Sequence, residues 1–152
     1  MGEQFKVVAS NRRATHDYEI VERFEAGLVL HGSEVKSLRA GNIQLKDSYA
    51  TVERGEVFLI GAHIGAYSFA NRGGHEPERT RKLLLNRREI DRIAADLAEK
   101  GLTLVPLRVY FKNGIAKIEV GLGRGRRTVD KRHAIREREM KREMDRSTRR
   151  RR

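Results

Sequence analysis

Residues 105–122 read VPLRVYFKNGIAKIEVGL and give the clearest indication of the fold. Asn113-Gly114 is typical of the tight turn of a β-hairpin, because both residues tolerate the positive φ angles of a type I′ turn. Apolar and polar residues alternate on both sides of this turn, as in two paired strands with one buried face. The register set by the turn predicts four apolar pairs on that face: Phe111–Ala116, Val109–Ile118, Leu107–Val120 and Val105–Leu122.

The other face of this hairpin is polar. The same register predicts Tyr110 opposite Lys117 and Arg108 opposite Glu119. Because neighbouring residues of a strand point to opposite faces, these side chains are expected on the outside of the sheet. The hairpin is therefore predicted to be half buried, with basic and aromatic side chains on its outer face.

Further strands and helices are predicted upstream of the hairpin. Even-numbered apolar residues over 18–30 indicate a half-buried strand: Tyr18, Ile20, Phe24, Ala26, Leu28 and Leu30. Glu22 interrupts this pattern, and Gly27 permits a sharp bend. Residues 33–40 are typical of a short helix, which Ser33 would cap, with Val35 and Leu38 facing inward.

The middle of the chain alternates between strands, a loop and one long helix. Strands are predicted at 47–53, 56–61 and 81–85, with a long loop over 62–80. Apolar residues recur with helical spacing over 87–100, Asn86 and Glu89 have capping-box spacing, and Gly101 follows as a stop. Residues 1–16 are predicted to be a polar, basic lead-in.

Together these elements predict a mainly β fold with α-helices packed on it. About six strands and one long late helix favour a small antiparallel Greek-key barrel of the oligonucleotide-binding type. The apolar pattern stops after Leu122. We therefore expect a β-barrel domain over 1–123 and a basic C-terminal tail over 124–152, disordered in the free protein.

Charge is distributed unevenly over the 152 residues. The chain has 33 Lys and Arg against 21 Asp and Glu, and residues 124–152 alone contribute 14 basic and 5 acidic residues. Such a basic tail indicates an arm for a polyanion. A membrane-binding helix would need a wide apolar face, which the few apolar residues of this tail do not supply. Nucleic acid is therefore the favoured partner, and no membrane is expected.

The sequence contains no motif for catalysis or metal binding. It has no cysteine, and no pair of its five histidines has metal-ligand spacing. Gly121, Gly123 and Gly125 follow a predicted strand but lack the spacing of a dinucleotide-binding loop. The absence of a signal-peptide pattern predicts a cytoplasmic protein. We expect a binding protein rather than an enzyme, with no cofactor, metal or small-molecule substrate.

Several segments, in the same order, resemble one family. They are FEAG at 24–27, GSEVKSLRAG at 32–41, RTRKLLL at 79–85 and VDKR at 129–132. This set resembles the SsrA-binding proteins, or small protein B, the partners of transfer-messenger RNA (tmRNA) in bacterial ribosome rescue. The resemblance implies that the barrel binds the tRNA-like domain of tmRNA. It also implies delivery to stalled ribosomes for trans-translation.

The resemblance implies two sets of binding residues. Those expected to face the RNA are Asn11, Arg12, His16, Glu25, Lys36, Arg39, Asn42, Leu84 and Lys117. Those expected to act in the tail are Gly125, Arg126, Arg127, Asp130, Lys131 and Arg132. The family's tail becomes helical in the empty messenger channel and reaches the decoding site of the small subunit. Val129 stands where the family often has an aromatic residue or His, and valine cannot stack on a base in that way.

A second interpretation remains open from the residues alone. A generic RNA chaperone or ribosome-associated factor with an oligonucleotide-binding fold would share the barrel and the basic tail. Salt-dependent affinity does not separate the two, since both would contact phosphates.

Overall fold

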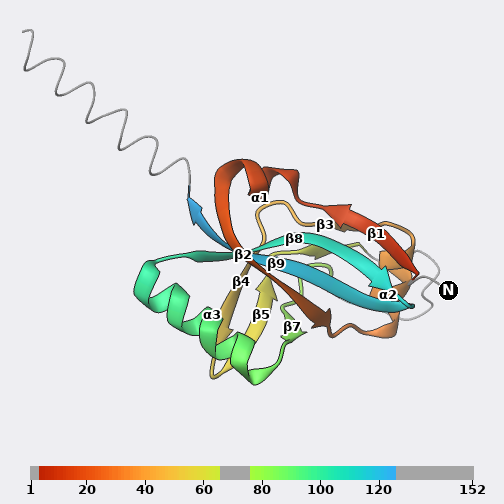
Figure 1. Cartoon of the computed structure of the whole chain (residues 1–152). Helices are drawn as coiled ribbons and strands as arrows, with labels where there is room; N and C mark the ends of the chain where they lie inside the picture. The colour runs from red at the N-terminus through yellow and green to blue at the C-terminus, as the bar shows by residue number, and fades with distance from the viewer. Residues whose placement is uncertain (1–3, 66–75, 126–152) are drawn as a thin grey trace, which may run out of the picture.

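The computed structural model describes residues 4–65 and 76–125, and Figure 1 shows that they form a barrel with helices around it. Six strands close the barrel in the order β8-β4-β5-β7-β2-β9, and β9 pairs back with β8. All these pairings are antiparallel. The strands are β2 (Tyr18–Leu28), β4 (Tyr49–Glu53), β5 (Glu56–Ile60), β7 (Arg81–Leu84), β8 (Thr103–Lys112) and β9 (Ile115–Gly125). The predicted antiparallel barrel of about six strands is confirmed.

Three helices and three further strands complete the described residues. The helices are α1 (Arg12–Asp17), α2 (Gly32–Arg39) and α3 (Arg87–Lys100). Strand β1 (Phe5–Ser10) pairs with β8 outside the closed barrel, and β3 (Ile43–Gln44) pairs with β6 (His63–Ile64). None of the helices within 4–65 and 76–125 is long and apolar enough to cross a membrane.

The long helix agrees with the prediction and the short one departs from it slightly. Helix α3 begins directly after Asn86, which forms the predicted capping box with Glu89, and ends at Gly101, where φ is 61°. Helix α2 begins at Gly32 instead of Ser33. Its start is held by Glu34, whose Oε1 accepts a hydrogen bond of 2.8 Å from the backbone N–H of His31. The predicted cap by Ser33 was therefore wrong.

The turn at Asn113-Gly114 is confirmed, with φ angles of 51° and 78°. Near this turn the predicted register holds, since Phe111 pairs with Ala116 and Val109 with Ile118. The polar pairs Tyr110–Lys117 and Arg108–Glu119 are also present. The side chains of the buried face belong to the main core, which fills the barrel.

Beyond Arg108 the predicted register is wrong by one residue. The structure pairs Pro106 with Val120 and Leu104 with Leu122, because the register shifts between Pro106 and Arg108. Leu107 is the extra residue of this bulge, a feature that increases twist and moves later side chains to the opposite face. Proline has no N–H for the ladder, so a bulge is one of the few places where a strand accepts it.

The bulge creates a second, smaller core on the outside of the barrel. Val105 and Leu107 leave the main core and pack with the buried Ala14 of α1. Tyr18 and Ile20 join this cluster, because β2 carries its own register shift between Ile20 and Glu22. This shift explains why Glu22 interrupts the sequence pattern. It also corrects the expectation that Tyr18 and Ile20 share a face with Phe24.

Two glycines of β9 leave room for this outer core. A Cβ on Gly121 would lie 2.9 Å from Cγ2 of Ile20, and a Cβ on Gly123 would lie 2.9 Å from Cβ of Tyr18. Both distances are below any ordinary carbon–carbon contact. The glycine spacing therefore serves close packing of β2 on β9.

The prediction for residues 1–16 was wrong. They contain β1 and α1 instead of being only a polar, basic lead-in. Val8 and Ala9 pack against the main core, and Ala14 is buried in the outer core. The predicted loop over 62–80 contains the short strand β6, while residues 66–75 lie outside the description.

Candidate nucleic-acid interface

Three of the predicted RNA-facing residues come together on the outer surface of neighbouring strands. Gly27 of β2 pairs with Leu84 of β7 on one side and with Lys117 of β9 on the other. Glu25 lies two residues from Gly27 and so points to the same face. Leu84 is 55% exposed although it is apolar, which argues against a core role. Because Gly27 has no side chain, the side chain of Leu84 packs closely beside it: a Cβ on Gly27 would lie 3.3 Å from Cβ of Leu84.

Glu25 is held in its ionised form by its neighbours. The hydroxyl of Tyr110 donates to Glu25 Oε2 over 2.5 Å, and Lys112 Nζ lies 3.6 Å from Oε1. The hydrogen bond from Tyr110 lowers the pKa of Glu25, with smaller contributions from Lys112 and Lys117 that act against partial burial. Burial is the main cause that raises the pKa of Tyr110, and the nearby carboxylate of Glu25 raises it further. At neutral pH the exposed carboxylate can accept hydrogen bonds from base amino groups.

An aromatic and arginine cluster adjoins this carboxylate. The ring centroids of Phe5 and Tyr110 are 4.5 Å apart, and the guanidinium of Arg108 lies 5.2 Å from each centroid. Phe5 remains 46% exposed and so presents a ring to solvent. The sequence prediction did not include Phe5 among the binding residues. Its signal was the alternation of Phe5, Val7 and Ala9, which was read as part of an irregular lead-in.

Asn11 holds α1 against the bulge of β8. Its Oδ1 accepts from the Ala14 N–H over 3.3 Å, and its Nδ2 donates to the carbonyl of Pro106 over 3.0 Å. Its backbone N–H also donates to the carbonyl of Leu107 over 2.7 Å. The two side-chain bonds use one donor and one acceptor position of this half-buried amide. In this structure Asn11 positions α1 and its exposed neighbour Arg12.

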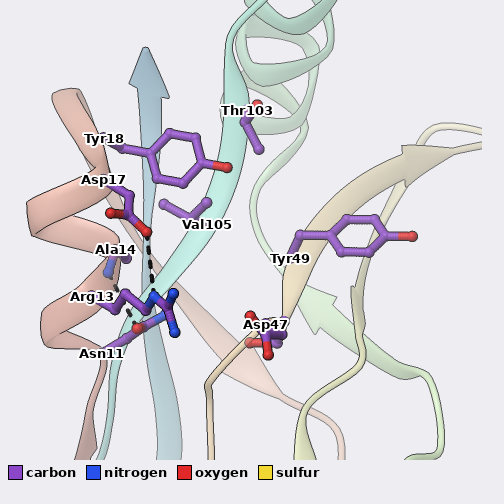
Figure 2. A pocket seen from close by; sticks show the side chains of 10 residues that line it. Asn11, Arg13, Ala14, Asp17, Tyr18, Asp47, Tyr49, Thr103 and Val105 are labelled. Carbon is purple, nitrogen blue, oxygen red and sulfur yellow. Dashed lines mark hydrogen bonds and ion pairs between the residues drawn. The ribbon is translucent and has the colours of Figure 1, made fainter. Parts of the chain in front are cut away.

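The two sides of α1 differ in charge. Figure 2 shows a pocket on one side, where Arg13 pairs with Asp17 over 3.6 Å and Asp47 and Tyr49 lie on the opposite wall. Two carboxylates at this pocket disfavour a phosphate. Arg12 instead lines a separate cleft with Arg23 and Arg108. The side of α1 that carries Arg12 is therefore the side suited to RNA.

His16 is exposed at the end of α1, with its Nδ1 3.1 Å from Asp17 Oδ1. The three remaining predicted residues lie elsewhere, on α2 and the turn after it. Lys36 and Asn42 are exposed, and the guanidinium of Arg39 lies 5.7 Å from the ring centroid of Phe111. Arg39 and Phe5 line the same cavity, whose volume is about 480 Å³. Arg39 therefore lies next to the start of β1 and not next to Lys117.

A buried ion network fixes α2 to the barrel. The carboxylate of Glu34 accepts a hydrogen bond of 2.6 Å from Arg79 Nη2 and one of 2.7 Å from Arg81 Nε. The side chains of Glu34 and Arg81 are fully buried. Arg81 also donates to the carbonyls of Ala62 and Pro77. Burial alone would raise the pKa of Glu34, but hydrogen bonds from Arg79, the His31 backbone and Arg81 lower it to about 2. These residues therefore position the helix that carries Lys36 and Arg39.

Strand β9 continues to Gly125, which pairs with Tyr18. Gly125 and its neighbour Arg124 are thus part of the sheet, two residues past the expected end of the barrel domain. The other predicted tail residues lie outside the described residues: Arg126, Arg127, Asp130, Lys131 and Arg132. Within 4–65 and 76–125, no three His, Asp or Glu side chains gather in a way that could hold a metal ion.

Comparison with known proteins identifies the family. The family model described as SmpB protein matches residues 8–150, a range that includes every binding residue predicted from the sequence. The chain belongs to the SmpB family. The SsrA-binding protein of Anaeromyxobacter sp. (strain Fw109-5) is 58% identical over 147 residues, covering 97% of this chain and 89% of that protein. The SsrA-binding protein of Halalkalibacterium halodurans is 53% identical over 148 residues, covering 97% and 96%.

A solved structure supports the same assignment. A chain from the structure described as "tmRNA-SmpB: a journey to the center of the bacterial ribosome" matches this SmpB-family fold with a TM-score of 0.65. The two sequences are 48% identical, and the match covers 77% of this chain and 82% of that one. The resemblance to the SsrA-binding proteins is confirmed, and the barrel is the fold that carries it.

Proposed function

We propose that this SmpB-family chain binds the tRNA-like domain of tmRNA and delivers it to stalled ribosomes for trans-translation. The barrel holds the RNA through the face that carries Glu25, Leu84 and Lys117. The segment after Gly125 then occupies the empty messenger channel and the decoding site of the small subunit. The protein acts in the cytoplasm by binding and delivery, with no chemical step of its own.

One observation carries the RNA-binding part of this proposal. Leu84, Gly27 and Lys117 follow one another across three strands, with the ionised Glu25 beside them. An exposed leucine, a lysine and a carboxylate offer an apolar contact, a phosphate contact and a hydrogen-bond acceptor. This mixture suits a folded RNA with splayed bases better than a uniform polyanion.

A competition experiment tests the proposal against a generic RNA chaperone. The full chain is bound to a labelled transcript of the tRNA-like domain, and unlabelled competitors are added at a fixed salt concentration. We expect the same transcript to compete much more strongly than an unstructured strand of equal length. Equal competition by both RNAs would contradict the proposed function and favour the chaperone.

Lys117→Ala is expected to weaken binding of the tRNA-like transcript without unfolding the protein. Lys117 lies on the outer face and is only half buried, so truncation leaves no cavity in the core. Loss of one phosphate contact should lower the slope of log affinity against log salt by about one unit. Lys100→Ala on α3, where the amine pairs with Asp96 over 3.6 Å, is the matched control and should leave the slope unchanged. An unaltered slope for Lys117→Ala would remove this residue from the site.

A further inference from the structure

Next to Glu25 and Tyr110, the outer surface contains a cleft whose volume is about 370 Å³. It lies where α1, β2, β8 and β9 meet, and three arginines reach it from three different elements. Arg12 belongs to α1, Arg23 to β2 and Arg108 to β8. The rest of the lining consists of Ser10, Asn11, Thr15, Leu107 and Glu119. One carboxylate against three guanidinium groups leaves the cleft positively charged.

Glu119 of β9 holds two of these arginines in place. Its Oε1 lies 3.2 Å from Arg23 Nη1, and its Oε2 lies 3.4 Å from Arg108 Nη2. The carboxylate thus stands between two guanidinium groups that would otherwise repel each other. The rings of Phe5 and Tyr110 further restrict Arg108, whose guanidinium lies 5.2 Å from both centroids.

This arrangement leaves donors of the arginines available for a ligand. The side chains of Arg23 and Arg108 are 57% and 39% exposed, so both guanidinium groups can be reached from solvent. Each arginine has five N–H donors, and the bonds to Glu119 occupy one nitrogen of Arg23 and one of Arg108. Guanidinium groups bind phosphate with two parallel hydrogen bonds when their planes are fixed.

From this geometry we infer that the cleft of Arg12, Arg23 and Arg108 binds one backbone phosphate of the RNA, with Glu119 as the residue that orients the two strand arginines. The inference rests on the proposed function and adds a defined phosphate site to it. Glu119 lies directly opposite Glu25 in the pairing of β9 with β2. The proposed phosphate site therefore adjoins the carboxylate that is proposed to contact a base. The RNA backbone therefore runs from the Lys117 region toward the Arg12 side of α1.

The structure provides a matched pair of variants for the test. Arg23 pairs with Glu119 over 3.2 Å and its side chain is 57% exposed, whereas Arg92 pairs with Glu22 over 2.9 Å and is 63% exposed. Arg23→Gln and Arg92→Gln therefore remove the same charge and a similar ion pair, but only the first alters the cleft. Affinity for a transcript of the tRNA-like domain is measured over a range of salt concentrations for both full-length variants.

We expect Arg23→Gln to reduce affinity for the transcript about tenfold, which corresponds to the loss of one charge-assisted hydrogen bond. The slope of log affinity against log salt should fall by about one unit. Arg92→Gln should match the wild type. Equal effects of the two variants would overturn the phosphate site. If the wild-type chain itself failed to prefer the tRNA-like transcript over an unstructured strand, the proposed function would fail instead, so the two failures are distinguishable.

Glu119→Gln tests the orienting role separately. This change raises the net charge of the cleft by one, so attraction by charge alone predicts tighter binding of the transcript. An orienting carboxylate predicts weaker binding, because Arg23 and Arg108 lose the group that fixes their planes. We expect a loss of affinity of about threefold or more, on the scale of the net contribution of a typical hydrogen bond, with thermal stability checked in parallel. A gain in affinity would overturn the role assigned to Glu119.

Discussion

At pH 7, Glu34→Gln is expected to lower the free energy of unfolding by about 3–5 kcal/mol, the usual cost of removing one partner from a buried ion pair. The side chains of Glu34 and Arg81 are fully buried, and Arg79 also donates to the same carboxylate. The neutral amide leaves the buried charge of Arg81 without a counter-ion. Chemical denaturation of the full chain, followed by circular dichroism, measures this loss.

Two further variants show whether the buried charge is the cause. Glu56→Gln removes the exposed partner of Lys82, which lies 2.9 Å away, and should cost no more than about 1 kcal/mol. The double variant Glu34→Leu with Arg81→Met removes both buried charges and should recover much of the loss. A Glu34→Gln protein as stable as Glu56→Gln would show that this network contributes little.

The same carboxylate predicts a pH dependence of stability. The pKa of Glu34 is about 2 in the folded protein, against an ordinary value of 4.5. Its contribution is therefore fully present above about pH 4.5 and is lost as the pH falls toward 2, because the unfolded chain binds the proton more tightly. A depression of this size corresponds to about 3 kcal/mol. The stability difference between wild type and Glu34→Gln should shrink over this interval.

The sequence predicted those elements whose local signals agree with the tertiary structure. The turn at Asn113-Gly114 fixed the register of its neighbours, and the spacing of Asn86, Glu89 and Gly101 gave both ends of α3. In both places a short-range signal acts alone. No distant contact is needed to decide the conformation.

Predictions failed where an extra residue enters a strand. A bulge at Leu107 moves Leu107 and Val105 from the main core to the outer core, and a second bulge in β2 moves Ile20 with them. In β8 the apolar pattern continues across the bulge, because residues 104–107 are all buried and both faces of the strand are covered there. Pro106 and Glu22 were the visible signals, since neither fits a regular ladder at its place.

The candidate interface was predicted only in part for a related reason. Glu25, Leu84 and Lys117 were named by resemblance, and the pairing of Gly27 with its two neighbours brings them together. The cleft beside them requires Arg23 and Glu119 to meet, although they are 96 residues apart in the chain. Only the pairing of β2 with β9 in the folded barrel creates that contact. No local sequence pattern could therefore predict it.

Substitutions in the C-terminal tail are expected to have the largest effect on function, and this expectation rests on the sequence. Replacing Asp130, Lys131 and Arg132 together with alanine is expected to abolish peptide tagging on stalled ribosomes. Affinity for the tRNA-like transcript should stay nearly unchanged, because the proposed RNA face lies on the barrel. Tagging in a reconstituted translation reaction and transcript binding are measured on the same protein. Loss of both activities in a folded variant would contradict this division of labour.

A chain ending after Gly125 is the control, since it keeps the pairing of Gly125 with Tyr18 that a shorter chain would lose. It should bind the transcript and fail in tagging.

We propose that the free tail lacks stable structure, because residues 126–152 carry 13 basic against 5 acidic residues and the excess of positive charge is repulsive. Contact with RNA phosphates removes this repulsion and releases counter-ions, which can supply the free energy of ordering. Amide hydrogen exchange should therefore be fast across 130–146 in the free protein and slow on the stalled ribosome. Strong protection without RNA or ribosome would mean a preformed helix and would exclude folding on arrival.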